Sequence, residues 1–230
     1  MRLDKYLGQS GVATRSEATK FIRARRVTVD GAVVRDPAVH IDPATASVTL
    51  DGQAVLWREF TYVMLNKPEG YVSSTEDRGP TVMELLPPQF VRMGLFPCGR
   101  LDIDTVGFLL VTNDGPTAHE LLSPKHHREK TYGFECLPLT MEMKKRLESG
   151  VELSDFTSKP CTVQLDDATH GRITVTEGKY HQIKRMFHAV GSEITYLERL
   201  TFAGLTLDKK LARGEWRELT EEEINVLLGK

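Results

Sequence analysis

The chain has 230 residues, of which 40% are hydrophobic and 27% charged, and its formal net charge is −2. This composition is typical of a globular protein with a core and excludes the low-complexity and disordered classes. No apolar run reaches the length of a membrane-spanning helix, and residues 1–5 do not resemble a secretion signal, so we expect a cytoplasmic protein without a membrane partner. The three cysteines are far apart, which excludes a Cys-x-x-Cys motif.

The small net charge hides a basic N-terminal segment. Residues 1–35 carry eight basic side chains against three acidic ones, so this segment has a net charge of +5. A basic segment on an otherwise acidic chain favours contact with a polyanion. The candidate contacts are Arg2, Lys5, Arg15, Lys20, Arg23, Arg25 and Arg26.

The first fifty residues predict two helices followed by short strands. Apolar spacing predicts one helix that ends near Gly11, and Thr14 with Glu17 forms a capping box that opens a second helix. The pair Asp30-Gly31 between two valine-rich runs is typical of a β-hairpin. This order resembles the S4 RNA-binding domain, which implies that Lys and Arg side chains of the helix pair lie against RNA phosphates.

The remainder predicts a second, larger domain. We expect an S4-like domain with its connector over residues 1–59 and the second domain over residues 60–230. Strand patterns outnumber helical ones and do not alternate with them, which predicts an α+β domain with an extended mixed, mainly antiparallel β-sheet flanked by helices. The strand patterns cover residues 62–65, 71–74, 107–112, 132–137, 161–165, 172–176, 193–198 and 202–207. The helical patterns cover residues 81–87, 117–122, 141–149, 180–190 and the C-terminal segment that Thr220 caps.

One loop of the second domain predicts a reactive carboxylate. Asp102 lies between Leu101 and Ile103, with strand patterns on either side, so the backbone can hold its side chain still and partly dry. Such a carboxylate suits a nucleophile or a general base. An ordinary turn, in which Asp102 or Asp104 accepts backbone N–H groups, also accounts for this stretch. A glycosidase pair of Asp102 and Asp104 is disfavoured, because no aromatic sugar-binding platform accompanies it.

The sequence predicts neither a metal nor a cofactor. His126 and His127 are adjacent and point apart, whereas His181 and His188 lie seven residues apart without a carboxylate at ligand spacing. Neither Gly-x-Gly-x-x-Gly nor Gly-Lys-Ser/Thr occurs, so no nucleotide-binding loop is indicated. We therefore expect side chains and substrate to supply the chemistry without a cofactor.

Five motifs of the second domain follow a recognisable order. They are Leu65-Asn66-Lys67-Pro68-Glu69-Gly70, Gly99-Arg100-Leu101-Asp102, Asn113-Asp114-Gly115, Glu129-Lys130-Thr131-Tyr132 and the run from Glu177 to Met186. Across about residues 60–200 they resemble the pseudouridine synthases, and in particular the RsuA branch, whose members begin with an S4 domain. This resemblance implies an isomerase that breaks the C1′–N1 bond of a uridine and rejoins the uracil through C5, without cofactor or metal.

The resemblance also implies three catalytic residues. Asp102 would attack C1′ of the ribose or C6 of the ring, and both possibilities stay open. Lys184 would pair with Asp102 and keep its carboxylate ionised in a dry pocket. Tyr132 would stack on the uracil, which must leave its base stack to reach Asp102. The expected substrate-binding residues are Arg100, Leu101, Ile183, Lys67, Lys130 and Arg185, with Lys67 ordering the site.

A second basic run predicts further RNA contacts near the pocket mouth. It comprises Lys125, His126, His127, Arg128 and Lys130. Within the family, residues 123–132 are most similar to enzymes of the small subunit, which implies 16S rRNA or a small-subunit assembly intermediate as partner and uridine 516 as target. The alternatives are a large-subunit (23S) rRNA synthase of this family and a non-catalytic RNA-binding or ribosome assembly factor. We expect a monomer.

Overall fold

The computed structural model describes residues 1–230 except Pro124, His126 and His127, and it divides the chain into two compact units. The first unit comprises Met1–Thr61 and Met83–Phe96, and the second comprises Tyr62–Val82 and Pro97–Lys230. The chain thus first passes from one unit to the other close to the boundary expected after residue 59. The return of residues 83–96 to the first unit was not indicated by the sequence.

The first unit contains a helix pair and a small antiparallel sheet. The helices are α1 (Leu3–Gln9) and α2 (Arg15–Arg23), and the strands are β1 (Val27–Val29), β2 (Ala32–Val33), β3 (Val48–Leu50) and β4 (Gln53–Ala54), in the order β2-β1-β3-β4. The predicted capping box is present, because Thr14 Oγ1 accepts a hydrogen bond from Glu17 N and the Glu17 carboxylate accepts one from Thr14 N. Leu3, Leu7 and Ile22 are fully buried in the core.

The segment 83–96 carries a helix that the sequence analysis did not predict. The short helix expected over residues 81–87 is present as the 3-10 helix η1 (Val82–Leu85), and α3 (Pro88–Arg92) begins where we expected that helix to end. Proline is well suited to the first turn of a helix, where its missing N–H is not needed. Arg92 Nε donates a hydrogen bond of 2.8 Å to the carbonyl of Gly11, which ties this helix to the first unit.

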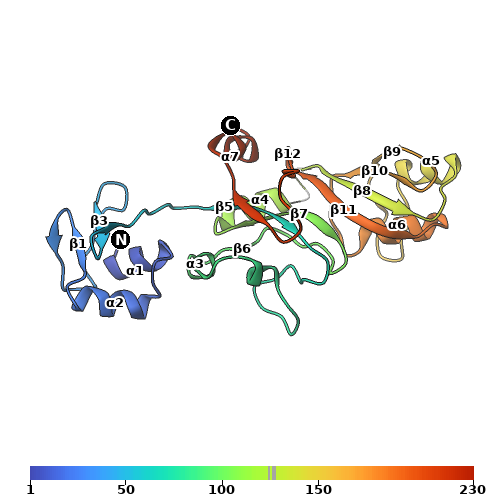
Figure 1. Ribbon diagram of the computed structural model, residues 1–230. Coiled ribbons are helices and arrows are strands. Elements are labelled where there is room, and N and C mark those ends of the chain that lie inside the picture. Colours follow the sequence, from blue (N-terminus) through green and yellow to red (C-terminus); the bar gives the residue numbers. More distant parts are fainter. Residues whose placement is uncertain (124, 126–127) are drawn as a thin grey trace. The chain divides into compact units, whose positions relative to one another are not determined.

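The second unit is built on one large mixed sheet (Figure 1). Its strand order is β13-β5-β7-β11-β8-β10-β9, with β12 beside β11 and β6 beside β7. The strands are β5 (Tyr62–Lys67), β6 (Phe96–Pro97), β7 (Val106–Thr112), β8 (Lys130–Cys136), β9 (Thr162–Leu165), β10 (His170–Val175), β11 (Ile194–Phe202), β12 (Leu205–Thr206) and β13 (Trp216–Glu218). Only β11 and β7 pair in parallel among the registers of the described residues, so the predicted mixed, mainly antiparallel α+β fold is confirmed.

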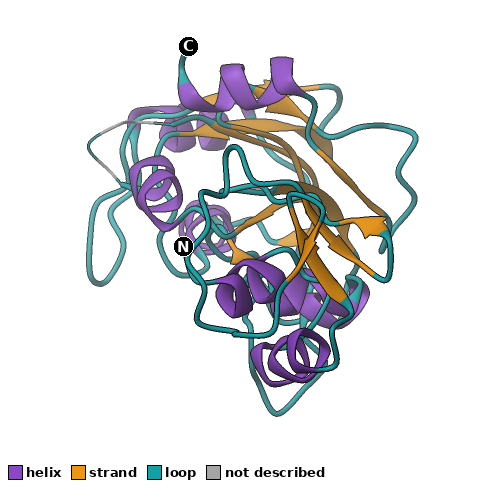
Figure 2. Ribbon diagram, turned by 90° about the vertical axis from the view of Figure 1, so that its left-hand side faces the viewer, coloured by secondary structure: helices purple, strands orange, loops and turns teal. Residues whose placement is uncertain are grey.

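Among the residues that the structure describes, four α-helices flank this sheet. They are α4 (Gly115–Leu122), α5 (Met141–Ser149), α6 (Gln182–Val190) and α7 (Glu221–Leu228). Helix α6 packs against β11 and α5, and α7 packs against β12. Figure 2 shows the long strands curving side by side, as the right-handed twist of a sheet requires. Within the described residues, no helix has both the length and the apolar character needed to cross a membrane.

One strand prediction in the second unit was wrong. Residues 71–74 form no strand and contribute only an isolated bridge between Val72 and Thr81. The strands expected over residues 193–198 and 202–207 are both present, as β11, which continues to Phe202, and as the short β12. Irregular pairing with β8 between Ile194 and Tyr196 and between Arg199 and Thr201 interrupts the alternation of buried and exposed side chains, so the full length of β11 was not predicted.

A row of paired residues crosses the sheet where β7 and β11 run in parallel. Lys67 of β5 pairs with Gly107 of β7, Gly107 with Arg199 of β11, and Arg199 with Tyr132 of β8. Gly107 has a φ of +98°, and a Cβ built on it would lie 2.4 Å from the carbonyl oxygen of Arg199. Only glycine therefore fits this close approach of two backbones.

We predict that Gly107→Ala lowers the free energy of unfolding by about 2 kcal/mol or more, because it combines an unfavourable φ with a backbone clash. Urea unfolding of the full chain measures this change. Gly133→Ala is the matched control, since a Cβ on Gly133 of β8 would meet only the side chain of Leu200, at 3.4 Å. Equal effects of the two substitutions would show that the β7–β11 approach does not constrain the fold.

Candidate active site

A cavity of about 810 Å³ lies in the second unit. Its walls come from the loop of residues 99–105, from β8, from residues 175–184 and from β11. Volumes of this order are usual for sites that enclose a small molecule. Of the expected catalytic and substrate-binding residues, the cavity is lined by Asp102, Tyr132, Lys184, Arg100, Leu101, Ile183 and Lys130.

The loop that carries Asp102 is held by the buried side chain of Lys67. The Nζ atom of Lys67 donates hydrogen bonds of 2.8–3.2 Å to the backbone carbonyls of Pro68, Asp102, Ile103 and Thr105. Burial lowers the pKa of Lys67 to about 8, against the opposing effect of nearby carboxylates. Lys67 does not line the cavity, so it orders the loop and does not occupy the substrate contact that we also expected of it.

The side chain of Asp102 faces basic groups of α6 and its N-terminus. Its Oδ2 lies 3.3 Å from Lys184 Nζ, and its Oδ1 lies 3.6 Å from Nε2 of His181. Within the described residues the carboxylate accepts no backbone N–H, whereas the backbone carbonyl of Asp102 closes a turn with Thr105 N at 3.1 Å. The turn is therefore real, but the Asp102 side chain is not what closes it.

A second carboxylate, that of Asp104, also forms an ion pair with Lys184. Asp104 Oδ1 lies 2.5 Å from Lys184 Nζ, closer than either oxygen of Asp102. Burial alone would raise the pKa of Asp104, but the hydrogen bond and charge of Lys184 outweigh it and hold this pKa below its usual value. The sequence analysis predicted the pairing of Lys184 with Asp102 and missed Asp104 as its nearer partner.

His181 is a site residue that the sequence analysis considered only as a metal ligand. It precedes α6 with a φ of +48° and a ψ of +30°, a left-handed conformation that is uncommon for residues other than glycine but that histidine, asparagine and aspartate adopt more often than most. Its ring stacks on that of Tyr180, with centroids 3.8 Å apart and planes 18° from parallel. Because His181 comes three residues before Lys184, helical spacing could have placed both beside Asp102.

The remaining walls of the cavity are apolar and cationic. Tyr132, Ile183 and Leu101 are buried and present apolar surface. Arg199, which the sequence analysis missed, is 2% exposed and donates a 2.7 Å hydrogen bond from Nε to the carbonyl of Phe108. Its position in a strand between Glu198 and Leu200 carried no signal of a site, because only the pairing of β11 with β7 and β8 brings it to the cavity.

One expected substrate contact lies elsewhere than predicted. Arg185 does not line the cavity; its guanidinium binds Asp155 and lies over the ring of Phe156, because one residue along a helix turns a side chain by about 100°. Lys130, expected both as a substrate contact and in the second basic run, lines the cavity, and its Nζ donates a hydrogen bond of 3.1 Å to the carbonyl of Arg128. Burial, and then the charge of Arg199, lower the pKa of Lys130 to about 8.

The rest of the second basic run is only partly described. Lys125 is exposed, and Arg128 lies 3.5 Å from Glu120 of α4. His126 and His127 lie outside the described residues.

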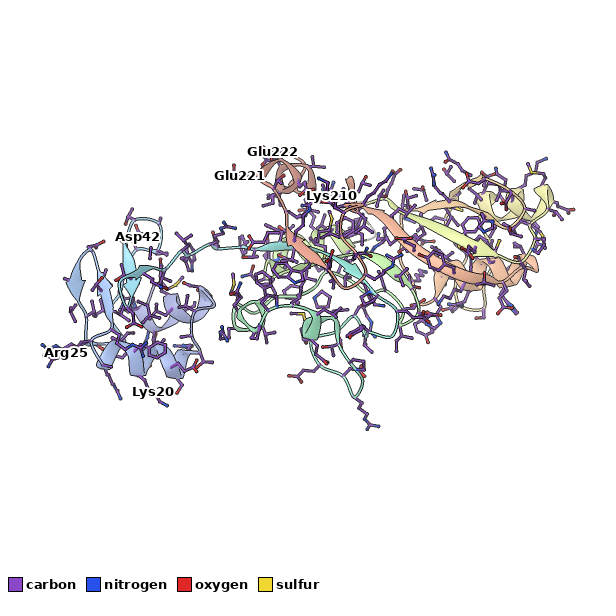
Figure 3. The ribbon with its side chains drawn as sticks, viewed as in Figure 1. Lys20, Arg25, Asp42, Lys210, Glu221 and Glu222 are labelled. Atoms are coloured by element: carbon purple, nitrogen blue, oxygen red, sulfur yellow. The ribbon has the colours of Figure 1, made fainter. Side chains whose placement is uncertain are left out.

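The basic residues of the first unit fall into two groups. Arg2 pairs with Asp4 at 2.7 Å, Arg26 pairs with Asp51 at 2.5 Å, and Arg15 lies 3.8 Å from Asp4. Within the described residues Lys5, Lys20, Arg23 and Arg25 are exposed and form no ion pair. Figure 3 shows Lys20 and Arg25 pointing away from the unit. Within the described residues, the second group is therefore the part of the expected polyanion surface without an ion pair, although the charge of Lys20 still acts on Glu17.

We predict that Lys184→Met raises the pKa of Asp104, because the substitution removes the hydrogen bond and the charge that lower it. Carbon-detected NMR titration of the side-chain carboxyl groups measures this pKa. Lys209→Met, which removes an exposed lysine outside the cavity, should leave it unchanged. An unaltered Asp104 pKa in Lys184→Met would contradict the geometry of the ion pair.

Known proteins resemble this chain over nearly its whole length. Residues 61–189 match the family described as RNA pseudouridylate synthase, and residues 1–45 match the S4 domain. The chain is 47% identical to the "Uncharacterized RNA pseudouridine synthase YtzG" of Bacillus subtilis (strain 168), over 99% of this chain and 98% of that protein. It is 44% identical to "Ribosomal small subunit pseudouridine synthase A" of Escherichia coli (strain K12), over 97% and 98%.

A solved structure gives the same result. The protein described as "Crystal structure of pseudouridylate synthase" superposes with a TM-score of 0.70 at 36% identity, over 99% of both chains. The S4 match lies within residues 1–59 and the pseudouridylate synthase match within residues 60–230. The chain therefore belongs to the RNA pseudouridylate synthase family, as a member of the S4-containing RsuA branch.

Proposed function

We propose that this pseudouridine synthase isomerises one uridine of small-subunit (16S) rRNA, with Asp102 as its nucleophile. The observation that carries the proposal is the ion pair of Asp102 and Lys184 in the wall of a cavity that Tyr132 also lines. The relative from Escherichia coli is named for the small ribosomal subunit, whereas the relative from Bacillus subtilis is named without a target. Uridine 516 is the target that the resemblance of residues 123–132 implies.

The roles of the residues follow from their surroundings. Lys184 forms an ion pair with the carboxylate of Asp102, the group that attacks carbon in this proposal. Lys67 fixes the loop backbone on both sides of Asp102, so the carboxylate is positioned before substrate arrives. Tyr132 and Ile183 offer apolar surface to a uracil ring that has left its stack. Arg100, exposed at the cavity wall, is placed to contact an RNA phosphate or the vacated base position.

In this proposal, the first unit supplies the affinity for RNA. Lys5, Lys20, Arg23 and Arg25 are exposed and present positive charge to phosphates, and within the described residues none of them forms an ion pair. Phosphate contacts hold RNA without reading its sequence, so the choice of uridine falls to the second unit and to the shape of the RNA.

We predict that Asp102→Asn reduces pseudouridine formation by about 1,000-fold or more, because it removes the nucleophile while preserving size. RNA affinity should stay within a few-fold of wild type. Carbodiimide modification followed by primer extension on unmodified 16S rRNA measures the product, and filter binding measures affinity.

Asp166→Asn, an exposed carboxylate outside the cavity, is the matched control and should retain activity. A large loss of RNA binding in Asp102→Asn would contradict its assignment. A wild-type protein that binds 16S rRNA but yields no new stop would support a non-catalytic assembly factor instead.

We also predict that replacing Lys20, Arg23 and Arg25 together by glutamine weakens rRNA binding and flattens its salt dependence. Each lost phosphate contact reduces the slope of log affinity against log salt by roughly 0.7–0.9. Binding isotherms over a series of salt concentrations measure the slope. The same replacement of Lys209, Lys210 and Lys230, all exposed in the second unit, is the control. An unchanged slope in the first variant would show that α2 and its C-terminal end do not bind rRNA.

A further inference from the structure

Two buried cations of the cavity have no role in the chemistry described so far. Lys130 and Arg199 are 7% and 2% exposed, and both line the cavity. They come from neighbouring strands, where Arg199 pairs with Tyr132 and Phe202 pairs with Lys130. Lys130 Nζ lies 5.6 Å and the Arg199 guanidinium 4.9 Å from the centre of the Phe202 ring. The two charges therefore lie against the same ring, and we call this pair the cationic wall.

The cationic wall has fewer partners than buried charges require. Within the described residues neither side chain forms an ion pair; Lys130 makes one hydrogen bond, to the carbonyl of Arg128, and Arg199 makes one, to that of Phe108. Nη2 of Arg199 is closed off from solvent without a hydrogen-bond partner. Two like charges in such a place are unfavourable unless something negative compensates them.

One buried carboxylate compensates the wall only in part. The charge of Glu177, which is 8% exposed and lines the cavity, raises the pKa of Lys130, but less than burial and Arg199 lower it. Its Oε1 already accepts hydrogen bonds from Lys159 N and Gln182 Nε2. Two cations against one carboxylate leave one net positive charge on this side of the cavity.

The charges around the nucleophile, in contrast, are compensated. Asp102 and Asp104 both face the ammonium group of Lys184, and the charges of both also raise the pKa of Lys67 beneath the loop. The excess positive charge of the buried residues therefore lies at the cationic wall, which lines a partly dry space where charges act strongly. This excess favours movement of electrons from the nucleophile toward the wall.

The reaction moves electrons in this direction. When Asp102 attacks C1′, an ester bond forms and the C1′–N1 bond breaks, and its electron pair stays on the uracil, which becomes a monoanion with charge spread over N1, O2 and O4. After the ring turns, C5 attacks C1′ and Asp102 leaves as a carboxylate. The C5 proton then passes to a base and N1 takes up a proton, so the product has the composition of the substrate. Attack at C6 also leaves the electron pair of the cleaved bond on the base.

We propose that the cationic wall binds the uracil ring as a monoanion once the C1′–N1 bond has broken, and so lowers the barrier to cleavage and retains the ring while it turns. The proposal rests on the proposed function of the same cavity. A single negative charge on the ring neutralises the single positive charge left by Lys130, Arg199 and Glu177. Preorganised charge at a site where negative charge develops is worth roughly 100- to 1,000-fold in rate in other enzymes.

Binding of free pyrimidines tests the wall without RNA. The probe is 5-nitrouracil, a monoanion near neutral pH, and its neutral reference is uracil; calorimetry with the full-length protein measures both. We expect the anion to bind at least about tenfold more tightly, and Arg199→Met and Lys130→Met each to abolish this preference. Arg172→Met, which removes an exposed cation from β10, should retain it.

Lack of an anion preference in the wild type, or its persistence in both variants, would overturn the proposal. Competition by inorganic phosphate with the same dependence on Arg199 would also overturn it, because the wall would then be a phosphate site. Should Arg199→Met not fold, Lys130→Met decides the outcome, and Arg199→Lys should restore the preference in part.

The leaving group of the RNA provides the second test. Fluorine at C5 makes the departing uracil a weaker base, so 5-fluorouridine at the target position needs less help from the wall. We expect Lys130→Met to slow cleavage of the N-glycosidic bond of uridine about 100-fold in single turnover, and that of 5-fluorouridine much less. A merely structural defect would slow both substrates equally, and that result would overturn the proposal.

The two tests separate this inference from the proposed function. If the wild type prefers 5-nitrouracil but leaves 16S rRNA unmodified, the cationic wall is supported and the proposed rRNA substrate is wrong. If the wild type isomerises 16S rRNA but shows no anion preference, the proposed function stands and the wall is wrong.

Discussion

The arrangement of the site depends on one buried ammonium group, that of Lys67. It binds four backbone carbonyls, and three of them belong to the short loop that carries Asp102. An ammonium group is a donor only, so it can gather carbonyl oxygens that would otherwise repel one another. Because these contacts are to the backbone, they fix the path of the loop and leave the carboxylate of Asp102 available to Lys184 and substrate. Lys67 therefore positions the nucleophile, whereas a different residue, Lys184, pairs with its carboxylate.

The sheet connects this loop to other residues that line the cavity. Lys67, Gly107, Arg199 and Tyr132 form one row of cross-strand neighbours, so the group that holds the nucleophile loop and two groups that line the cavity share the same rigid element. Gly107 is the position at which this row has no room for a side chain. The close approach of the parallel strands β7 and β11 thus sets the distance between Lys67, which holds the loop, and the cavity residues Arg199 and Tyr132. The loop then only has to supply the carboxylate of Asp102.

Charge is divided between the two units and again within the cavity. The first unit presents exposed lysine and arginine side chains, which suit phosphates in water. In the cavity, Asp102 and Lys184 are half-buried and Lys130, Glu177 and Arg199 are buried, and there each charge acts more strongly. Lysine and arginine side chains therefore serve two purposes in this protein. Exposed ones provide affinity for a polyanion, and buried ones act on a single base.

Much of this protein follows from local sequence. The capping box at Thr14, the hairpin at Asp30-Gly31 and the loop around Asp102 all depend on neighbours a few residues away, and spacing therefore predicts them. The ordered motifs also predicted the family, and with it the pairing of Lys184 with Asp102. In contrast, three features depend on contacts between segments that are distant in the sequence. They are the return of residues 83–96 to the first unit, the ion pair of Asp104 with Lys184 and the burial of Arg199. Only the tertiary structure decides these, because strand pairing, unlike helix capping, joins residues whose separation along the chain carries no periodic signal.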